Sequence, residues 1–330
     1  MEECNKIKVV AVIGPTASGK TKLAVEICRK FNGEVISCDS MQIYKYMDIA
    51  SAKPTKEEMN GVPHHLIDFI LPGEEYSAAL FQRDAVGCID DISSRGRLPV
   101  IAGGTGLYYD SLVNYEKYVF YDSDREYRAY LESLLDGAGN IELMKLYNAA
   151  LKEGEKPLHP NDTKRIIRYL EKRYCEEKSK EALSIEGAVG ESENAKNPTE
   201  DEIGSYLKNV TFIPILLDSR DRAFLYERIN KRVDKMLEKG LMEEARSFFE
   251  NAHSITSVQA IGYKELLPAI KNEKRIDECV ESLKKATRNY AKRQLSRFHS
   301  YNNIKTIYID EYKNEEEIIQ AATEYLCEIL

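Results

Sequence analysis

Short apolar runs alternate with amphipathic stretches over the first 115 residues of the chain. Residues 8–13 form an apolar run that ends in glycine, a pattern typical of a buried parallel strand. The same reasoning predicts strands at 8–13, 34–38, 65–70 and 98–102, separated by helices at 20–31 and about 77–94. Strands that alternate with helices at this spacing predict βαβ units and a doubly wound parallel sheet.

The alternation stops near Tyr115, and the chain is polar and helical in pattern as far as about Tyr174. The following segment, 176–202, has nine acidic residues, three lysines and few large apolar side chains, so we predict a mobile loop there. The sheet resumes at 211–217, where Pro214 suits an edge strand or a bulge. Helices are then predicted over about 220–297, followed by a last strand at 304–309 and a terminal helix.

Composition narrows the class of protein. None of the apolar runs in the 330 residues approaches the roughly 20 residues that span a bilayer. The acidic N-terminus lacks the basic region of a signal peptide. Seven scattered cysteines without a C-x-x-C pair argue against a disulfide framework or a zinc site. We therefore expect a cytoplasmic protein without a membrane segment.

Charge is segregated along the chain. The formal net charge is −8, from 47 basic and 55 acidic residues, yet 284–297 carries six basic residues and no acidic one. Residues 164–173 carry five basic residues and a single Glu171. Because binding of a polyanion depends on local clusters, the negative total does not exclude nucleic acid as a partner.

A phosphate-binding motif follows the first predicted strand. The pattern G-x-x-x-x-G-K-[ST] is matched by Gly14, Pro15, Thr16, Ala17, Ser18, Gly19, Lys20 and Thr21. In such loops the backbone N–H groups and the helix N-terminus bind phosphate oxygens, while the lysine adds a positive charge. The Thr21 hydroxyl is the candidate ligand for Mg²⁺. The motif predicts a polyphosphate ligand but does not define the reaction.

A second candidate site residue is Asp39, which ends the strand predicted at 34–38. The strand at 98–102 runs instead into Gly103, Gly104 and Thr105, so the aspartate usual in a P-loop nucleoside triphosphatase is missing there. From the residues alone, the Asp39 carboxylate could hold Mg²⁺, cap a helix or act as a base facing the phosphate site.

Nine short motifs occur in an order that resembles one enzyme family across nearly the whole chain. They are the loop 14–21, Asp39-Ser40-Met41-Gln42-Ile43-Tyr44, Ala52-Lys53-Pro54, Pro63-His64-His65, Tyr76-Ser77, Gly103-Gly104-Thr105-Gly106-Leu107-Tyr108, His159-Pro160-Asn161-Asp162, Gly262-Tyr263-Lys264-Glu265 and Thr287-Arg288-Asn289-Tyr290-Ala291-Lys292-Arg293-Gln294. The set resembles the tRNA dimethylallyltransferases, also called tRNA isopentenyltransferases.

The resemblance implies transfer of a dimethylallyl group from its diphosphate to N6 of the adenine immediately 3′ of the anticodon. Asp39 matches the general base of the family, and Thr105 matches a hydroxyl near the reacting amine. Lys20 and Mg²⁺ would stabilise the negative charge that builds on diphosphate, and Arg232 matches an arginine that reaches it.

The target adenine would have to be flipped out of the anticodon loop, so contacts to tRNA are implied as well. The residues that match or extend those contacts are Asp39, Ser40, Met41, Gln42, Thr105, Arg128, Lys164, Arg165, Arg168, Gln259, Gly262, Tyr263, Lys264, Lys292 and Arg293. Arg165 and Arg168 share one face of a predicted helix that Asn161-Asp162 can cap.

We therefore predict a P-loop α/β protein with a parallel sheet flanked by helices. Residues 1–115 and 206–330 are assigned to the catalytic core, and 116–205 to a helical tRNA-binding insertion. Its partners would be the anticodon stem-loop of tRNA and dimethylallyl diphosphate, with Mg²⁺ as cofactor. We expect a monomer with no obligate protein partner.

Three alternatives compete with this interpretation. A metabolite or nucleotide kinase would use the arginines of 165–173 as lid residues, and an isopentenyltransferase acting on free adenine nucleotides would need no RNA surface. An RNA-binding switch protein would only sense nucleotide. The extended basic stretch at 284–297 argues against both small-substrate enzymes, and Asp39 with Thr105 argues against a passive switch.

Overall fold

The computed structural model describes residues 6–115, 124–138, 140–185, 200–250 and 260–330. The chain divides into two compact units. The first comprises Met1–Tyr118 and Pro198–Leu330, and the second comprises Val119–Asn197. The boundary predicted at 205 falls inside a helix of the first unit, α8 (Glu200–Lys208). Each unit is described by itself.

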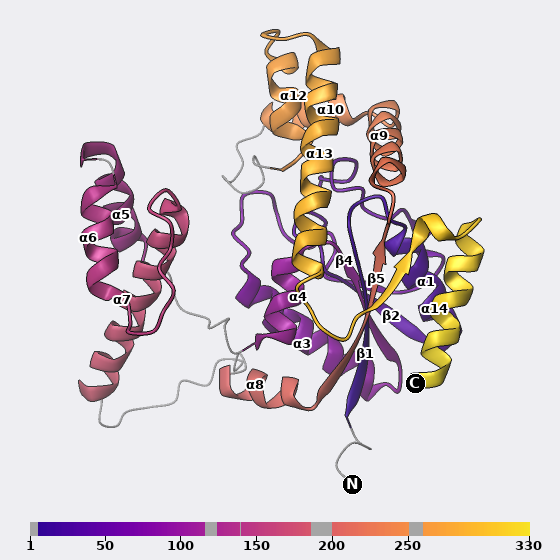
Figure 1. Cartoon of the computed structure of the whole chain (residues 1–330), viewed down its shortest axis with the longest axis horizontal. Helices are drawn as coiled ribbons and strands as arrows, with labels where there is room; N and C mark the ends of the chain where they lie inside the picture. The colour runs from indigo at the N-terminus through magenta and orange to yellow at the C-terminus, as the bar shows by residue number, and fades with distance from the viewer. Residues whose placement is uncertain (1–5, 116–123, 139, 186–199, 251–259) are drawn as a thin grey trace. The chain divides into compact units, whose positions relative to one another are not determined.

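The first unit contains a six-stranded parallel sheet with the order β3-β2-β4-β1-β5-β6 (Figure 1). Its strands are β1 (Ile7–Ile13), β2 (Gly33–Ser37), β3 (His64–His65), β4 (Leu98–Gly103), β5 (Val210–Asp218) and β6 (Lys305–Tyr308). Because all the strands are parallel, the loops that follow β1, β2 and β4 meet at one edge of the sheet, where ligands of open α/β sheets bind. The predicted α/β fold is confirmed.

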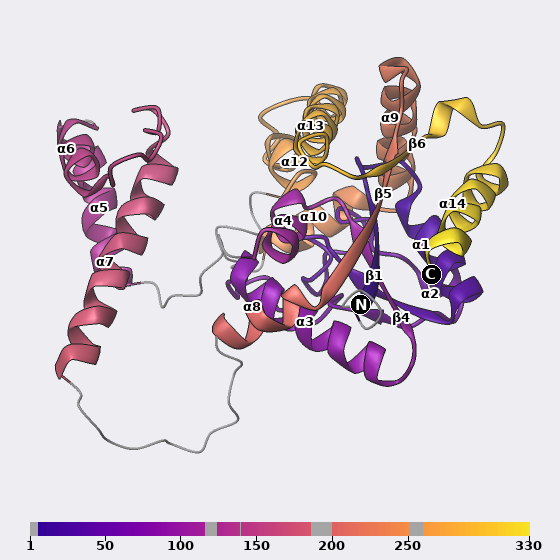
Figure 2. The same ribbon diagram turned by 60° about the horizontal axis from the view of Figure 1, so that its bottom comes forward.

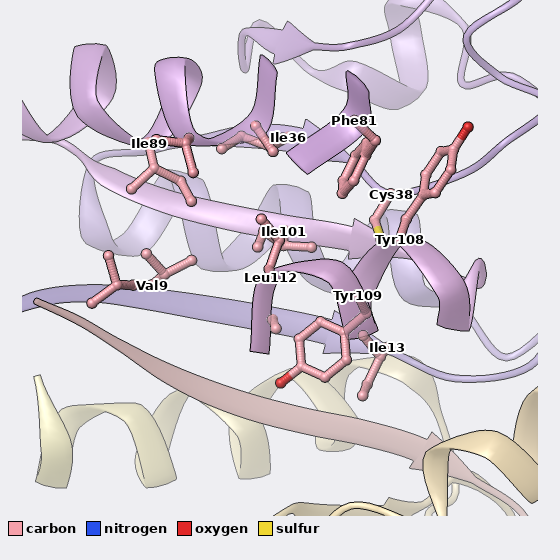
Figure 3. Packing of buried hydrophobic residues seen from close by; sticks show 14 of the residues in the cluster. Val9, Ile13, Ile36, Cys38, Phe81, Ile89, Ile101, Tyr108, Tyr109 and Leu112 are labelled. Atoms are coloured by element: carbon pink, nitrogen blue, oxygen red, sulfur yellow. The ribbon is translucent and has the colours of Figure 1, made fainter. Parts of the chain in front are cut away.

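Helices cover both faces of the sheet, which explains why β1, β4 and β5 are rich in apolar residues. On one face, Val9, Ile13, Ile36 and Ile101 belong to the same buried cluster as Phe81 (Figure 3). The helices that contribute to this cluster are α3 (Ala78–Ser94), α4 (Gly106–Val113) and α8. The other face is packed by α1 (Lys20–Phe31) and α14 (Glu315–Ile329) (Figure 2).

Two strand predictions differ from the structure. The strand predicted at 65–70 is confined to β3, because Leu66 and Asp68 adopt positive φ values of 55° and 58°. Residues 68–70 instead form backbone hydrogen bonds with the loop that follows β2. Pro214 lies in an interior strand, but β6 begins to pair with β5 only at Ile215. The strand is therefore edge-like on that side at the proline, as a missing N–H requires.

A group of helices in the first unit packs on the loop that follows β2. They are α9 (Arg222–Glu238), α10 (Leu241–Glu250), α12 (Tyr263–Ile270) and α13 (Ile276–Phe298), of which α10, α12 and α13 lie above the sheet in Figure 1. A buried cluster joins them to Ile43, Tyr44 and Met47 of that loop. Two further short elements of this unit are α2 (Lys56–Met59) and a 3₁₀ turn at Ile309–Glu311.

The second unit contains α5 (Arg125–Ala138), α6 (Ile141–Ala150) and α7 (Thr163–Ile185). Its core includes Leu131, Leu143, Tyr147, Ile166 and Leu170, which are at most 3% exposed. Along the described residues, neither unit has a helix with the length and apolar character needed to cross a membrane.

The prediction of a mobile loop over 176–202 is wrong at both ends. Helix α7 continues to Ile185, and α8 begins at Glu200; residues 186–199 lie outside the described residues. The beginning of the acidic segment is rich in Glu, Lys, Ala and Leu, which are strong helix formers. Glu176 also forms ion pairs one turn back, with Lys172 and Arg173. Low hydrophobicity alone therefore did not exclude a helix.

Candidate active site

The phosphate loop connects β1 to α1, as the motif predicts. Gly19 precedes the first residue of α1 with φ +96°, a conformation that glycine adopts without strain. The Ser18 hydroxyl donates a hydrogen bond to the carbonyl of Pro15 at 2.9 Å, and Arg228 of α9 donates through Nε to the carbonyl of Ala17 at 2.9 Å. These contacts hold the loop at the positive end of α1.

Lys20 provides the strongest electrostatic signal in the site. Its Nζ atom donates a hydrogen bond to the Pro15 carbonyl at 2.5 Å. Burial, together with the nearby positive charge of Arg232, lowers the pKa of Lys20 to about 7, although the charge of Asp39 acts in the opposite direction. An anion bound in the loop would favour the protonated amine, so the site is suited to a ligand with several negative charges.

The lowered pKa of Lys20 leads to a prediction for the binding of inorganic diphosphate. Above pH 7 the amine of the free site is largely neutral, and the bound anion raises its pKa; binding should therefore take up a proton. The affinity should fall as pH rises above about 7. Calorimetric titrations in buffers of different ionisation enthalpy measure the protons taken up.

Lys20→Met provides the control, because it removes the titrating amine but leaves the ionisation of diphosphate itself. The difference in proton uptake between the two proteins should approach one proton near pH 8. Equal uptake by both proteins would show that Lys20 is already charged before the anion binds.

Asp39 begins the loop after β2, and its carboxylate organises that loop. Its Oδ1 atom accepts hydrogen bonds from the backbone N–H groups of Met41, at 2.9 Å, and Gln42, at 3.4 Å. Among the described residues, none donates a hydrogen bond to its Oδ2 atom. One carboxylate oxygen therefore fixes the turn, and the other can accept a proton.

Thr105 joins the loop after β4 to the loop after β2. Its Oγ1 atom accepts a hydrogen bond from the Ser40 backbone N–H at 2.9 Å, and its own N–H donates to the Cys38 carbonyl at 3.1 Å. Gly103 makes this approach possible, since a Cβ atom there would lie 2.0 Å from the Cys38 oxygen. The parallel sheet thus places Thr105 beside the residue that follows Asp39.

Arg232 of α9 completes the predicted set. Burial lowers its pKa, and the opposite charge of Asp39 counteracts this effect. Its charge also acts on Lys20. The structure therefore brings Lys20, Asp39, Thr105 and Arg232 together at the carboxyl edge of the sheet.

Tyr290 on α13 was not singled out from the sequence, although it lies within one of the matching motifs. Its hydroxyl lies near the Thr105 side chain and interacts with it. Burial and the charge of Asp39 raise its pKa, so the hydroxyl stays protonated. The helical pattern of apolar positions around Tyr290 gives no indication that this residue contacts Thr105, which lies 185 residues earlier in the chain.

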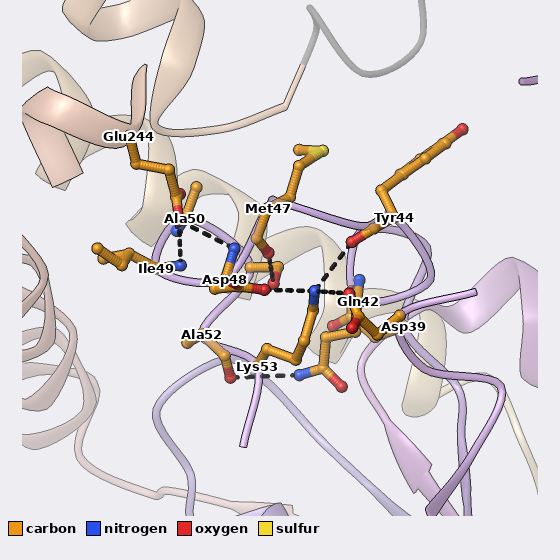
Figure 4. A network of polar contacts seen from close by, with 12 residues as sticks. Asp39, Gln42, Tyr44, Met47, Asp48, Ile49, Ala50, Ala52, Lys53 and Glu244 are labelled. Carbon is orange, nitrogen blue, oxygen red and sulfur yellow. Dashed lines mark hydrogen bonds and ion pairs between the residues drawn. The ribbon is translucent and has the colours of Figure 1, made fainter. Parts of the chain in front are cut away.

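Glu244 on α10 is a second residue that sequence reasoning missed. Its carboxylate accepts hydrogen bonds from the backbone N–H groups of Asp48, Ile49 and Ala50 at 2.7–2.9 Å (Figure 4). Three successive N–H groups of this kind form a cradle for an anion. The same carboxylate accepts the hydroxyl of Tyr263 at 2.9 Å.

Lys53 also stabilises the segment that follows Asp39. Its Nζ atom donates to the Tyr44 carbonyl at 3.0 Å and pairs with Asp48 and Asp68 at 2.5 and 2.6 Å (Figure 4). The lysine side chain is only 8% exposed. The segment that follows Asp39 is therefore fixed at several points, which gives its backbone a defined shape before any substrate binds.

The residues predicted to contact tRNA in the first unit have different surroundings. Ser40, Met41 and Gln42 are half-buried in the loop after Asp39, and Lys292 and Arg293 are exposed on α13. Two other basic residues of the stretch 284–297 are engaged by neighbouring side chains. Lys284 pairs with Asp234 at 2.8 Å, and Arg288 donates to the Asn230 side chain at 2.7 Å.

The motif at 259–264 is only partly accessible. Gln259 lies outside the described residues. Gly262 precedes α12, and Lys264 is 46% exposed beside Glu265. The Tyr263 side chain is fully buried, with its hydroxyl on Glu244, so a contact of this position with tRNA would have to use its backbone. A buried tyrosine requires a partner for its hydroxyl, and here that partner lies within the core.

In the second unit, the predicted basic face surrounds one buried acid. Lys164 is exposed, Arg165 is 74% exposed, and Arg168 is 52% exposed. Arg128 and Arg168 pair with Glu171 at 3.2 and 3.5 Å, and Glu171 is fully buried. These pairs orient both guanidinium groups on the surface of α5 and α7.

The residues present fit a magnesium ion carried by a diphosphate. Thr21 offers a hydroxyl beside the phosphate loop. Within the described part of the chain, no group of three or more His, Cys, Asp or Glu side chains could form a metal site made of protein alone. Mg²⁺ usually retains waters and binds through substrate phosphates with one or two protein oxygens, which this donor set allows.

Family models and curated relatives match almost the whole chain. The model described as IPP transferase matches residues 42–301, and the model described as isopentenyl transferase matches residues 7–69. The chain is 41% identical to a tRNA dimethylallyltransferase of Caldanaerobacter subterraneus subsp. tengcongensis, over 97% of this chain and 98% of that one. It is 44% identical to one from Acetivibrio thermocellus, over 96% and 97%.

Solved structures similar to this chain carry the same kind of name as these relatives. A tRNA isopentenylpyrophosphate transferase from Bacillus halodurans aligns over 98% of this chain and 96% of that one, with a TM-score of 0.67 and 37% identity. A eukaryotic dimethylallyltransferase described as acting on tRNA aligns over 98% and 80%, with a TM-score of 0.72 and 27% identity.

The fold and the site define a P-loop α/β protein in which a carboxylate faces a phosphate-binding loop. The family follows from the share of the chain that the matches cover and from their sequence identity. The chain belongs to the tRNA dimethylallyltransferase family.

Proposed function

We propose that this protein transfers a dimethylallyl group from dimethylallyl diphosphate to N6 of the adenine 3′-adjacent to the anticodon of tRNA. The observation that carries the proposal is the convergence of the Asp39 carboxylate with Lys20 and Arg232 at the phosphate loop. In this proposal Asp39 is the proton acceptor, and Lys20 and Arg232 bind the negatively charged leaving group beside it. The full-length similarity to enzymes named for this reaction supports it.

The residues account for both halves of the reaction. The N6 lone pair forms a bond to the allylic carbon while that carbon's bond to oxygen breaks, and diphosphate leaves with the bonding electrons. The proton of the amine passes to the Asp39 carboxylate. Lys20, Arg232 and the loop N–H groups stabilise the charge that develops on diphosphate. Thr105 and Tyr290 orient the acceptor beside Asp39.

Magnesium would supply additional neutralisation of the leaving diphosphate when bound, with Thr21 as the protein ligand. The anticodon stem-loop would contact the loop at 39–42, α13 and the basic faces of α5 and α7. We also infer a cytoplasmic monomer. Size-exclusion chromatography with light scattering tests the oligomeric state.

One experiment tests the proposed reaction. The protein is incubated with dimethylallyl diphosphate, Mg²⁺ and unmodified tRNA, and the nucleosides are then analysed by mass spectrometry. We expect a dimethylallyl-modified adenosine at the position after the anticodon, without any nucleoside triphosphate in the reaction. A strict requirement for ATP, or modification of free adenine nucleotide alone, would overturn the proposal in favour of one of the alternative enzymes.

The basic face of α7 gives a separate prediction for RNA binding. Replacing Arg165 and Arg168 together with alanine should weaken tRNA binding and reduce its salt dependence, by about 0.7 in log–log slope for each lost phosphate contact to single-stranded RNA. The reason is that binding releases fewer counterions from the RNA when a phosphate contact is lost. Fluorescence anisotropy at several salt concentrations measures the slope.

Lys145→Ala is the matched control, since Lys145 is a 67% exposed basic residue on α6 of the same unit. It should leave the slope unchanged. If the double variant had the slope of the unmodified protein, the two arginines would be only a solvated helix face.

A further inference from the structure

One buried glutamine connects the two loops of the site. Gln294 lies on α13 and is only 5% exposed. Its Oε1 atom accepts a hydrogen bond from the Thr16 backbone N–H at 2.9 Å, and its Nε2 atom donates to the Gly104 carbonyl at 2.8 Å. Thr16 belongs to the phosphate loop after β1, and Gly104 to the loop after β4. A single side chain therefore spans the gap between them.

The two partners determine which side chains are suitable. A backbone N–H can only donate, and a backbone carbonyl can only accept, so the bridging group needs an acceptor at one end and a donor at the other. An amide meets this requirement in one orientation. Gly104 is adapted to it, because a Cβ atom at that position would lie 2.1 Å from Nε2 of Gln294.

The bridged loops carry opposite halves of the reaction. The phosphate loop holds Lys20 and the leaving group, whereas Gly104 immediately precedes Thr105, which is hydrogen-bonded to Ser40 next to Asp39. Helix α13 is itself fixed one turn further on, where Phe298 is fully buried. The length of the Gln294 side chain thus sets the separation of the two loops.

We propose that Gln294 is a positioning residue that keeps the allylic diphosphate and the attacking amine in register. The proposal rests on the proposed function. Gln294 does not touch the reacting atoms; it acts through Thr16 and Gly104. Because both substrates bind mainly to other residues, a change of register affects the transition state more than either bound ground state.

Gln294→Glu gives the sharpest test, because it preserves size and changes only the donor. An ionised carboxylate can still accept from Thr16, but it repels the Gly104 carbonyl; the protonated acid reproduces the amide pattern. Above neutral pH we expect kcat to fall by about 10–100-fold, with the KM of each substrate changed less than about twofold. As pH is lowered, kcat of the variant should recover relative to the unmodified protein.

Gln82→Glu is the matched control. Gln82 is also 5% exposed, and its Nε2 donates to the Ser111 carbonyl at 2.5 Å, so this hydrogen bond joins α3 to α4 and involves neither Thr16 nor Gly104. This variant should lose thermal stability without a selective loss of kcat. Gln294→Met, which has neither donor nor acceptor, should have a low kcat at every pH and no recovery in acid; it replaces the glutamate variant if the latter does not fold.

Two results would overturn the proposal. One is a Gln294→Glu protein whose kcat matches that of Gln82→Glu across the pH range. The other is a loss confined to the KM of dimethylallyl diphosphate, which would mean that Gln294 only shapes the phosphate loop. If the unmodified protein itself transfers no dimethylallyl group to tRNA, the proposed function fails instead, so the two failures are distinguishable.

Discussion

Asp39→Asn should reduce turnover by about 10²–10⁴-fold, because the amide cannot accept the proton of the attacking amine. The asparagine Oδ1 atom can still accept the N–H groups of Met41 and Gln42, so the loop should keep its shape. The affinity for inorganic diphosphate should change little. Steady-state transfer to tRNA and calorimetric binding of diphosphate measure the two quantities.

Asp68→Asn is a suitable control, since Asp68 is an exposed carboxylate that pairs with Lys53 behind the same loop. It should retain most of the turnover. If diphosphate binding fell with turnover in Asp39→Asn, the carboxylate would be a metal or diphosphate ligand rather than the base, which is one of the roles that the sequence left open.

Gly103→Ala should lower the free energy of unfolding by about 3 kcal/mol or more, at or above the upper end of the usual effect of overpacking. The new Cβ would lie 2.0 Å from the Cys38 carbonyl oxygen. That oxygen accepts the Thr105 N–H, and the Cys38 N–H donates to the Ala102 carbonyl, so the backbone of Cys38 is held in place. Relief requires β2 and β4 to separate, which would also displace Asp39. Chemical denaturation measures the loss.

Gly87→Ala on α3 provides the comparison. Beyond its own helix, no described residue comes within 4 Å of a Cβ atom placed at Gly87, so replacement by alanine should raise the free energy of unfolding by about 0.5–1 kcal/mol. A Gly103→Ala protein as stable as the unmodified one would show that the two loops can separate, and the close contact of Thr105 with Ser40 would then be adjustable.

The elements that could be predicted are those determined by local pattern. Strand β1 is buried on both faces of the sheet. Its continuous apolar run predicts this burial without information from the rest of the chain. The phosphate loop is also determined locally, since the two glycines, Lys20 and Thr21 lie within eight positions and the helix follows directly. Asp39 was found because it directly follows a strand.

What could not be predicted depends on contacts between distant segments. The roles of Tyr290 and Gln294 appear only when α13 packs on loops more than 180 residues earlier. Glu244 has no sequence signal, because its partners are backbone N–H groups. The burial of Tyr263 could not be predicted either. The motif Gly262-Tyr263-Lys264-Glu265 does not indicate whether its tyrosine or its lysine faces the core.

The order of the strands has a consequence for how the protein is made on the ribosome. Strand β1 leaves the exit tunnel before the other strands of the sheet, and it remains an unpaired edge on one side until β5 has emerged, about 200 residues later. The Asp39 loop must wait longer still, because Glu244 and then α13 complete its supports. Contacts of such long range form slowly. A nascent or truncated chain that lacks α13 therefore has its phosphate loop and an exposed apolar strand edge, and it acquires an ordered acceptor site only after α13 has emerged.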